Sequence, residues 1–470
     1  MASFDLIVIG SGPGGYIAAI RGAQLGLKTA VAEKDSALGG TCLHRGCVPA
    51  KAWLETAHRF EQTRQAADFG IAGLDEKALR PDLPAIIRRK SRIILKNSKG
   101  IEFLMKKNNV TVLKGFGQLL GGGKVKVNDE VHDAKKIILA TGSVPSVPKD
   151  LPCLEADGRR VLNSDHALEM AELPGHMIIL GAGAIGVEFA SVFSRLGSKV
   201  TLVEFMDQLL PLEDQAVGAE LAKVFVRQHK IDVRVKTKIT SVERQSDKVV
   251  CALEGEKPGV IDGDCLLVAV GRQPFTMGAG LENTAAVLDR GTVNVDEFMR
   301  TNEPNLYAIG DIVRTPMLAH VASDEGIVAA EHAAMELGAD VKPHAIDYLR
   351  VPGCTYCDPE VGSVGMTEKE AVAKGFDVKT GSFPFMPVAK ANIIGETHGF
   401  IKVVADAATK KILGVHIIGP KATELVASGV AILAGQLSVD TLINTMYPHP
   451  TLNEVFPEAA RAVYGRALNC

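Results

Sequence analysis

Two groups of residues in this sequence could carry redox or acid-base chemistry. The first is the segment GGTCLHRGCVPAK at positions 39–51, which contains Cys42 and Cys47, with Pro49 in the first turn of an expected helix. One helical turn between two sulfurs allows a strained, reducible disulfide, and the dipole at the helix N-terminus would stabilise a Cys47 thiolate. The spacing alone does not distinguish such a pair from two unpaired buried cysteines.

The second group is the segment HPTLNE near the C-terminus, which contains His449 and Glu454. An imidazole can act as a general base, and a neighbouring carboxylate can orient the ring and raise its pKa. A single histidine in a terminal segment is more often a surface residue. Its role therefore depends on what the rest of the chain builds.

The elements that would position these residues are indicated by an internal repeat with an offset of 171 residues. Gly10, Gly12, Gly15, Leu25, Gly26, Lys28 and Glu33 recur as Gly181, Gly183, Gly186, Leu196, Gly197, Lys199 and Glu204. Each copy has an apolar strand, a glycine turn, an alanine-rich helix and a β-branched strand that ends in an acid. The sequence therefore predicts two similar βαβ units.

Each copy carries the GxGxxG pattern with an acid 23 residues after the first glycine. One such pattern is weak support for nucleotide binding, but two with the acid in place are much stronger. The glycines allow a tight turn, close approach of a pyrophosphate and close helix packing, while Glu33 and Glu204 would accept hydrogen bonds from two adenosine riboses. A carboxylate repels the 2′-phosphate of NADP, and no Arg or Lys follows Glu204 in EFMDQ, so NAD is favoured. Cysteines follow only the first unit, which favours a redox pair there.

Length and composition limit the remaining alternatives. A chain of 470 residues should form about three domains, and 46% hydrophobic with 23% charged residues is typical of a globular protein. The net charge of −3 favours neither nucleic acid nor an anionic membrane. Eight cysteines are too few for a secreted disulfide scaffold, and the glycine-interrupted N-terminal segment lacks a signal-peptide pattern. We expect a cytoplasmic protein.

The remaining segments give a coarse order of elements. Residues 50–110 resemble a pair of charged helices, and strand-like pieces follow up to IILATGSVP at 137–145. LLVAVGRQP at 266–274 and LYAIGD at 306–311 are further strands that run into turns. From about residue 346 alternating strand patterns and one Ala/Gly-rich helix predict a separate C-terminal domain.

Taken together, these motifs resemble the class I flavoprotein pyridine nucleotide-disulfide oxidoreductases, and within them the dihydrolipoamide dehydrogenases. The resemblance covers nearly the whole chain through both GxGxxG turns, GGTCxxxGCxPxK, ATG at 140–142, GRxP at 271–274, AIGD at 308–311 and HPTxxE. It implies an α/β fold with two Rossmann-like dinucleotide-binding domains and a C-terminal α+β dimerisation (interface) domain. The implied FAD-binding domain is residues 1–145 and 271–345, the NAD-binding domain 146–270 and the dimerisation domain 346–470.

The resemblance also implies site residues. It places Asp311 on the FAD ribitol, Ala319 and His320 near the flavin, Lys51 beside flavin N5, and Glu188 close to the nicotinamide. The other residues implied to bind the cofactors are Gly10, Gly12, Gly14, Gly15, Glu33, Lys34, Gly40, Thr41, Gly117, Thr141, Gly142, Ser143, Gly181, Gly183, Ala184, Ile185, Gly186, Glu204, Gly271, Arg272, Met317 and Leu318.

The implied activity is oxidation of protein-bound dihydrolipoamide by NAD⁺ through the disulfide and FAD. His449, oriented by Glu454, would deprotonate the substrate dithiol at the disulfide of the partner subunit in a homodimer. The thiolate would attack Cys42, and Cys47 would be released beside the flavin. The implied partners are lipoyl domains of 2-oxoacid dehydrogenase or glycine-cleavage complexes.

Several residues depart from the usual motifs. His44 and Arg45 stand where many members have Asn and Val, Asn453 stands where Ser is common, and Cys357 stands where Thr is usual. Cys354 and Cys357 form CxxC, but no second pair or histidine cluster supports zinc, so we expect a structural role and no metal. The remaining cysteines are Cys153, Cys251, Cys265 and Cys470, of which only Cys470 is a candidate reactive thiol.

Four alternatives remain. Glu204 argues against assignment as a glutathione reductase, and the second redox cysteine argues against assignment as an NADH oxidase. His449 and the lack of an adjacent C-terminal cysteine pair argue against assignment as a mercuric reductase. The fourth is a nucleotide-binding complex subunit without turnover, which the intact set of Cys42, Cys47, His449 and Glu454 opposes.

Overall fold

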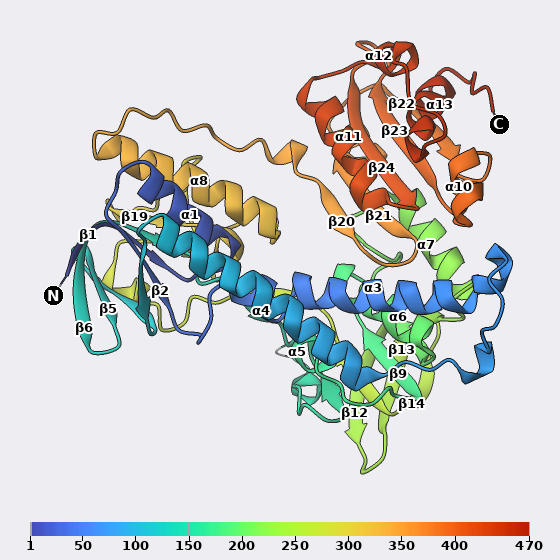
Figure 1. Cartoon of the computed structure of the whole chain (residues 1–470), viewed down its shortest axis with the longest axis horizontal. Helices are drawn as coiled ribbons and strands as arrows, with labels where there is room; N and C mark the ends of the chain where they lie inside the picture. The colour runs from blue at the N-terminus through green and yellow to red at the C-terminus, as the bar shows by residue number, and fades with distance from the viewer. Residues whose placement is uncertain (1, 149, 470) are drawn as a thin grey trace. The chain divides into compact units, whose positions relative to one another are not determined.

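The computed structural model describes residues 2–148 and 150–469 and contains two compact units (Figure 1). Unit 1 is made of the chain up to Trp53, of Pro84–Ser146 and of Gly271–Ile346. Unit 2 is made of Leu54–Leu83, Val147–Val270 and the chain from Asp347 onward. The chain therefore passes several times between the two.

Unit 1 is built on a seven-stranded sheet in the order β3-β2-β1-β6-β5-β4, with β19 also paired to β6. Its strands are β1 (Ser3–Ile9), β2 (Thr29–Glu33), β3 (Thr111–Lys114), β4 (Gly117–Gly121), β5 (Lys124–Val127), β6 (Glu130–Leu139) and β19 (Leu306–Ala308). The pairs β1–β2, β2–β3, β1–β6 and β6–β19 are parallel. Their carboxyl ends therefore lie along one edge of the sheet, where ligands of such sheets bind.

Helices and short elements complete unit 1. They are α1 (Pro13–Gln24), α2 (Gly40–His44), the first turns of α3 (Cys47–Arg64), α4 (Leu83–Lys107) from its second residue, α8 (Ala319–Glu336), β7 (Ser143–Pro145), β16 (Arg272–Pro274), β17 (Leu288–Asp289), β18 (Thr292–Val293) and the short 3₁₀ helices Leu281–Asn283 and Gly310–Ile312. Helices α1 and α8 lie side by side (Figure 1). The alanines and glycines that they bury allow this close packing, and the apolar strand residues beneath form the core.

Unit 2 contains a second parallel sheet in the order β11-β10-β9-β15-β8. Its strands and helices are β8 (Val161–Leu162), β9 (His176–Leu180), β10 (Lys199–Val203), β11 (Asp232–Arg234), β15 (Cys265–Val268), α5 (Ser164–Ala167), α6 (Ala184–Leu196) and α7 (Gln215–Arg227). An antiparallel meander of β12 (Thr237–Arg244), β13 (Val249–Gly255) and β14 (Gly259–Gly263) is inserted between β11 and β15.

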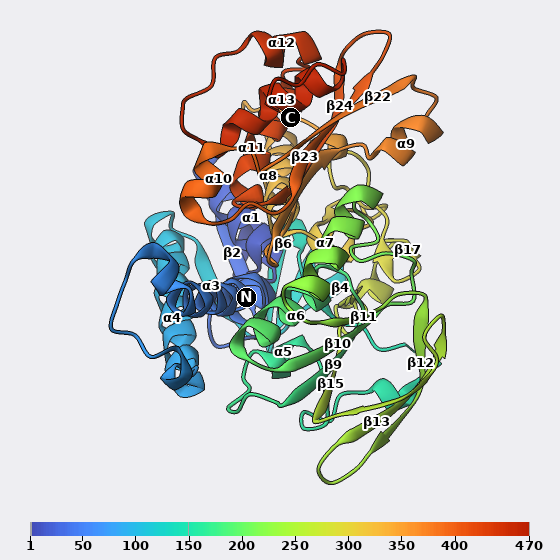
Figure 2. The ribbon, with the colours of Figure 1, turned by 90° about the vertical axis from the view of Figure 1, so that its right-hand side faces the viewer.

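The C-terminal part of unit 2 is an antiparallel sheet in the order β20-β21-β24-β23-β22 with helices packed on it (Figure 2). The strands are β20 (Gly353–Thr355), β21 (Glu360–Gly365), β22 (Val378–Pro384), β23 (Phe400–Asp406) and β24 (Ile412–Gly419). The helices are α9 (Glu368–Ala373), α10 (Ala389–Ile394), α11 (Ala422–Ala434), α12 (Val439–Asn444) and α13 (Val455–Ala462), with the 3₁₀ helix η7 (Leu452–Glu454). Buried residues of β21–β24, α11 and α13 form one hydrophobic core.

The predicted repeat has the same structure twice. β1-α1-β2 and β9-α6-β10 are parallel βαβ units, each with a glycine at positive φ after its first strand. A Cβ on Gly15 would lie 1.9 Å from the Gly10 carbonyl oxygen, and a Cβ on Gly186 would lie 1.8 Å from that of Gly181. The helix can therefore approach the strand only if the third glycine has no side chain.

The structure confirms the fold class of two dinucleotide-binding folds with a C-terminal α+β part. The charged helices predicted within residues 50–110 are α3 and α4. Residues 54–83, assigned from sequence to the first domain, group with unit 2. The FAD, NAD and dimerisation domain boundaries stay a prediction. Within the described residues, the helices are too short or too polar to cross a membrane.

The repeat gives a prediction about stability. Gly186→Ala should lower the thermal midpoint of unfolding by several degrees, because overpacking of this kind costs about 1–3 kcal/mol. Gly183→Ala is the matched control, since a Cβ on Gly183 would meet no described heavy atom within 4 Å. Circular dichroism melts of the two variants measure the difference. Equal midpoints would contradict the packing argument.

Candidate functional site

The glycine turn of the first repeat is closed by a carboxylate. Glu33 Oε2 accepts from the Ser11 amide at 2.9 Å, and Glu33 Oε1 accepts from the Asp35 amide at 2.8 Å. Ser11 also donates its hydroxyl hydrogen to Glu33. The acid predicted to bind a ribose therefore lies at the turn that follows β1, at the carboxyl edge of the sheet.

The second repeat has the same arrangement. Glu204 Oε2 accepts from the Ala182 amide at 2.6 Å, and Glu204 Oε1 accepts from the Met206 amide at 2.7 Å. The side chains of Phe205 and Met206, next to Glu204, are 68% and 48% exposed. A ribose at Glu204 would therefore lie beside apolar, accessible side chains.

Both glycine turns have room for a phosphate. A Cβ built on Gly12 or Gly183 would meet no described heavy atom within 4 Å, in contrast to the blocked third glycines. Gly12 and Gly183 are the N-cap residues of α1 and α6, and neither helix end receives a side-chain cap within the described residues. Uncapped helix N-termini beside open backbone fit the pyrophosphates of FAD and NAD.

Other predicted FAD residues meet at a junction in unit 1. Arg272 donates from Nε to Ser143 Oγ and from Nη2 to the Ser143 carbonyl, each at 2.7 Å, and Ser143 Oγ in turn donates to Asp311. Thr141 Oγ1 donates to the Phe275 carbonyl at 2.6 Å. The chain segments after β6, at β16 and after β19 are thus tied together at the carboxyl edge of the sheet.

Several other predicted FAD residues lie in unit 1, whereas Ala184 and Ile185 begin α6 in unit 2. Leu318 is the N-cap of α8, Ala319 and His320 are its first residues, and Met317 precedes it. Lys34 pairs with Asp35, and Gly40 and Thr41 begin α2. A Cβ on Gly117 would lie 2.9 Å from Ile9 Cγ2, which places Gly117 against the end of β1.

Cys42 and Cys47 lie together. Cys42 is in α2, Cys47 is the first residue of α3, and a hydrogen bond joins their side chains. That hydrogen bond and burial raise the pKa of the Cys42 thiol well above its usual range, although the charge of Lys51 acts in the opposite direction. Cys47 is exposed. The two sulfurs are therefore in contact, and the surroundings of Cys42 favour its protonated form.

Two departures from the usual motif stabilise this loop. His44 Nε2 bonds to the Leu38 carbonyl at 2.9 Å, and Arg45 pairs with Asp35 at 2.8 Å. Both side chains thus contact the loop that precedes α2.

His449 and Glu454 form a hydrogen-bonded pair in unit 2. His449 Nδ1 lies 2.9 Å from Glu454 Oε1, and Glu454 Oε2 accepts from the Thr451 amide at 3.0 Å. Burial would raise the pKa of Glu454, but the bonds from His449 and Thr451 outweigh it and lower the pKa. The His449 side chain is 71% exposed. The ring is therefore oriented by a carboxylate and accessible from outside the chain.

The other cysteines behave as packing residues. Cys357 is buried and donates to the Pro359 carbonyl at 3.2 Å, and burial raises its pKa. Cys354 lies 3.9 Å from the Thr423 carbonyl. Burial raises the pKa of Cys251 and of Cys265 to about 12. Cys470 lies outside the described residues.

Three residues that shape the site were not predicted from the sequence. Ser11 binds Glu33, Glu325 Oε2 accepts from the Gly310 amide at 2.6 Å, and the Tyr356 amide donates to Glu188 at 3.0 Å. Glu325 is fully buried, and its place in an alanine-rich helix could have indicated it, because a buried acid needs a partner. The backbone amide of Tyr356 has no sequence signal.

Comparisons with known proteins agree with this arrangement. Residues 4–326 match the family described as "Pyridine nucleotide-disulphide oxidoreductase", and residues 351–460 match its dimerisation domain. A dihydrolipoyl dehydrogenase of Bacillus subtilis is 41% identical over 99% of this chain and 99% of its own length. Dihydrolipoyl dehydrogenase 3 of Pseudomonas putida is 38% identical over 100% of both chains.

Solved structures give the same fold. LpdA of Mycobacterium tuberculosis matches with a TM-score of 0.87 and 28% identity, covering 98% of this chain and 99% of that chain. The HOCl-induced flavoprotein disulfide reductase RclA of Escherichia coli matches with a TM-score of 0.85 and 26% identity, covering 97% and 99%. The repeated nucleotide turns, the adjacent thiols and these matches lead to one conclusion: the chain belongs to the pyridine nucleotide-disulphide oxidoreductase family.

Proposed function

We propose that this protein oxidises dihydrolipoamide to lipoamide with NAD⁺, using FAD and a redox-active disulfide of Cys42 and Cys47. The observation that carries the proposal is the contact between these two side chains in the loop that follows the first nucleotide-binding unit. It is supported by relatives named dihydrolipoyl dehydrogenase, which are 41% and 38% identical over essentially their whole length.

The cofactors are FAD and NAD. The turn at Gly12, with Glu33 and the junction of Ser143, Arg272 and Asp311, would hold FAD, and the turn at Gly183, with Glu204, would hold NAD. When bound, FAD can take up the electron pair of a dithiol and NAD⁺ can carry it away as a hydride.

The protein's own residues perform the dithiol chemistry. His449, whose Nδ1 is held by Glu454, takes a proton from a substrate thiol at Nε2. The substrate thiolate attacks Cys42 Sγ, the bond between Cys42 and Cys47 breaks, and Cys47 leaves as a thiolate at the N-terminus of α3. The second substrate sulfur then attacks the substrate sulfur of the mixed disulfide, and the bond to Cys42 Sγ breaks, which releases lipoamide. The proton of the second thiol passes to the Cys42 sulfur, whose raised pKa favours the thiol.

The site would be shared in a homodimer. A dimerisation domain over residues 351–460 and the exposed His449 support a base that serves the Cys42–Cys47 pair of the partner subunit. The substrate dithiol would be carried on a lipoyl domain of a 2-oxoacid dehydrogenase or glycine-cleavage complex. We assign the protein to the cytoplasm, because a thiol-disulfide exchange enzyme with few cysteines suits a reducing compartment.

The roles of the two sulfurs can be distinguished by absorption. Two-electron reduction should give a long-wavelength charge-transfer band, because the Cys47 thiolate would lie beside oxidised flavin. Cys47→Ser should lack this band at every stage, whereas Cys42→Ser should show it before any reduction, because its Cys47 is free as a thiolate beside oxidised flavin. Absorption spectra recorded before and during anaerobic titration with dithionite measure both variants. The opposite result would reverse the assignment of the sulfurs.

Glu204 should determine the choice of nicotinamide cofactor. Glu204→Gln combined with Phe205→Arg removes the repulsion of the 2′-phosphate and supplies a positive partner for it. The kcat/KM for NADP relative to that for NAD should therefore rise about tenfold or more, because one charged hydrogen bond contributes that much. Glu204→Gln alone is the matched control for lost charge. Equal use of both cofactors by the unaltered protein would refute the role of Glu204.

The base should act only on the dithiol. His449→Gln should lower dithiol oxidation by roughly 10²- to 10⁴-fold, the usual share of acid-base catalysis, whereas flavin reduction by NADH should change little. Glu454→Gln should lower dithiol oxidation by a smaller factor, because Glu454 orients the imidazole ring and does not itself move the proton. Stopped-flow measurements of the two half-reactions give both values.

Mixing His449→Gln with Cys42→Ser subunits tests the shared site. If each site takes its disulfide from one chain and its base from the other, a heterodimer combines both substitutions at one of its two sites. Its second site then has an intact disulfide and an intact base. Recovered lipoamide activity after subunit exchange is the expected result. Exchange without recovery would assign His449 to its own chain's disulfide or to no role.

A further inference from the structure

Helix α6 carries a buried polar stripe. Glu188, Ser191 and Arg195 are spaced three and four residues apart, so they lie on one face of the helix. They are 6%, 0% and 7% exposed. Buried polar groups are costly unless they are hydrogen-bonded, so each member of this stripe must have a partner.

Two members bind one loop. The Tyr356 amide donates to Glu188 Oε1 at 3.0 Å, and the Asp358 amide donates to Ser191 Oγ at 3.1 Å. The loop Tyr356–Asp358 joins β20 to β21 at the start of the C-terminal sheet. Two successive turns of the nucleotide-binding helix are therefore fixed to the same short loop.

The third member binds α3. Arg195 donates from Nε to Glu61 Oε2 at 2.6 Å and from Nη2 to His58 Nδ1 at 3.1 Å. Burial and the charge of Arg195 lower the pKa of His58, which keeps the ring neutral at pH 7 and able to accept. The stripe thus has partners along its whole length.

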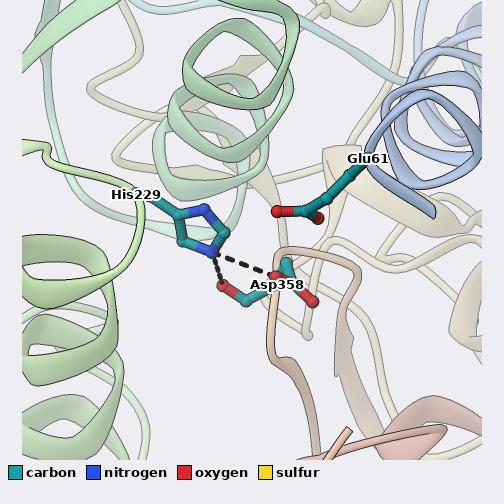
Figure 3. Close-up of side chains that lie close together, drawn as sticks. All are labelled: Glu61, His229 and Asp358. Atoms are coloured by element: carbon teal, nitrogen blue, oxygen red, sulfur yellow. Dashed lines mark hydrogen bonds and ion pairs between the residues drawn. The ribbon is translucent and has the colours of Figure 1, made fainter. Parts of the chain in front are cut away.

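The loop itself is held by a histidine. His229 Nε2 lies 3.0 Å from Asp358 Oδ2 and 3.1 Å from the Asp358 carbonyl oxygen, and Glu61 lies beside them (Figure 3). Burial would raise the pKa of Asp358, but the bond from His229 and the charge of Arg195 lower it to about 2. Ligand atoms of Glu61, His229 and Asp358 lie within 4.8 Å of one another. Because Arg195 already neutralises Glu61, this is an ion-pair network rather than a cation site.

The first repeat provides an internal comparison. At the offset of 171 residues, the stripe corresponds to Ile17, Ile20 and Gln24 of α1. Helix α1 packs on α8, and two of its three residues at these positions are apolar. The polar stripe is therefore a property of the second nucleotide-binding unit and not of the βαβ fold.

We propose that the stripe and its loop position Glu188 for the nicotinamide ring, so that Ser191 and Asp358 are positioning residues for the NAD half-reaction. This inference rests on the proposed function, which assigns Glu188 to the nicotinamide. The Tyr356 amide fixes one carboxylate oxygen of Glu188, and the bond between Asp358 and Ser191 fixes the loop that carries that amide. A carboxylate held in this way has its orientation set before the nucleotide binds.

The test compares two serines of the same helix. Ser191→Ala removes the acceptor for the Asp358 amide. Ser194→Ala removes a hydroxyl whose bonds, among the described residues, stay within α6, to the Ala190 and Ser191 carbonyls. Calorimetric titration of the oxidised holoenzyme with NAD⁺ and with ADP-ribose, which lacks nicotinamide, separates ring contacts from those of the rest of the nucleotide. Ser191→Ala should raise the NAD⁺ Kd about fivefold, the size of one hydrogen bond, and leave the ADP-ribose Kd unchanged. Ser194→Ala should change neither.

Asp358→Asn and Glu188→Gln complete the design. Asp358→Asn weakens the interaction between His229 and the loop, so it should also raise the NAD⁺ Kd, as Ser191→Ala does. Equal NAD⁺ Kd values for the two serine variants would overturn the positioning role. So would an equal loss of affinity for NAD⁺ and for ADP-ribose in Ser191→Ala. Glu188→Gln should weaken the binding of NAD⁺ and leave the binding of ADP-ribose unchanged. If it affects neither nucleotide, the assignment of Glu188 to the nicotinamide is wrong, and that failure is distinct from a failure of the stripe.

Discussion

Both nucleotide-binding turns are built on the same close contact between a helix glycine and a strand-end carbonyl. The third glycine of each turn lies so near the carbonyl of the first that a Cβ would come within 2 Å of it, at Gly15 and again at Gly186. This contact brings the helix N-terminus to the end of the strand. It leaves the second glycine open, and the carboxylate at the end of the next strand closes the turn by accepting two backbone amides. This backbone geometry suits a pyrophosphate at the positive helix end, and the carboxylate side chain is placed to accept from a ribose.

The two copies of this turn differ in what surrounds them. The first is followed by Cys42 and Cys47, and its helix packs on another helix. The second carries a polar stripe on its helix that binds a loop of the C-terminal sheet and two side chains of α3. Helix α3 begins at Cys47, so one helix contributes both the proposed redox thiol and partners for α6. The two copies of the fold thus differ in residues outside the glycine motif.

How far the sequence could predict this depends on the distance between partners. The turns, Glu33, Glu204 and the thiol pair follow from short motifs with fixed spacing, so they could be predicted. The His449–Glu454 contact was predictable because five residues separate the two. Glu188 and Tyr356 are 168 residues apart, and the donor is a backbone amide, which leaves no side-chain signal. The grouping of residues 54–83 with unit 2 also has no sequence signal, because a helix that crosses between units shows no composition change where it does so.

We infer that this flavoprotein passes electrons from a lipoyl dithiol to NAD⁺. Steady-state assays with dihydrolipoamide, reduced glutathione and reduced thioredoxin, each with NAD⁺ and NADP⁺, distinguish this activity from those of other disulfide oxidoreductases. We expect rapid turnover with dihydrolipoamide and NAD⁺ and little with any other combination. Fastest turnover with glutathione or thioredoxin, or with NADP⁺, would refute the proposed activity.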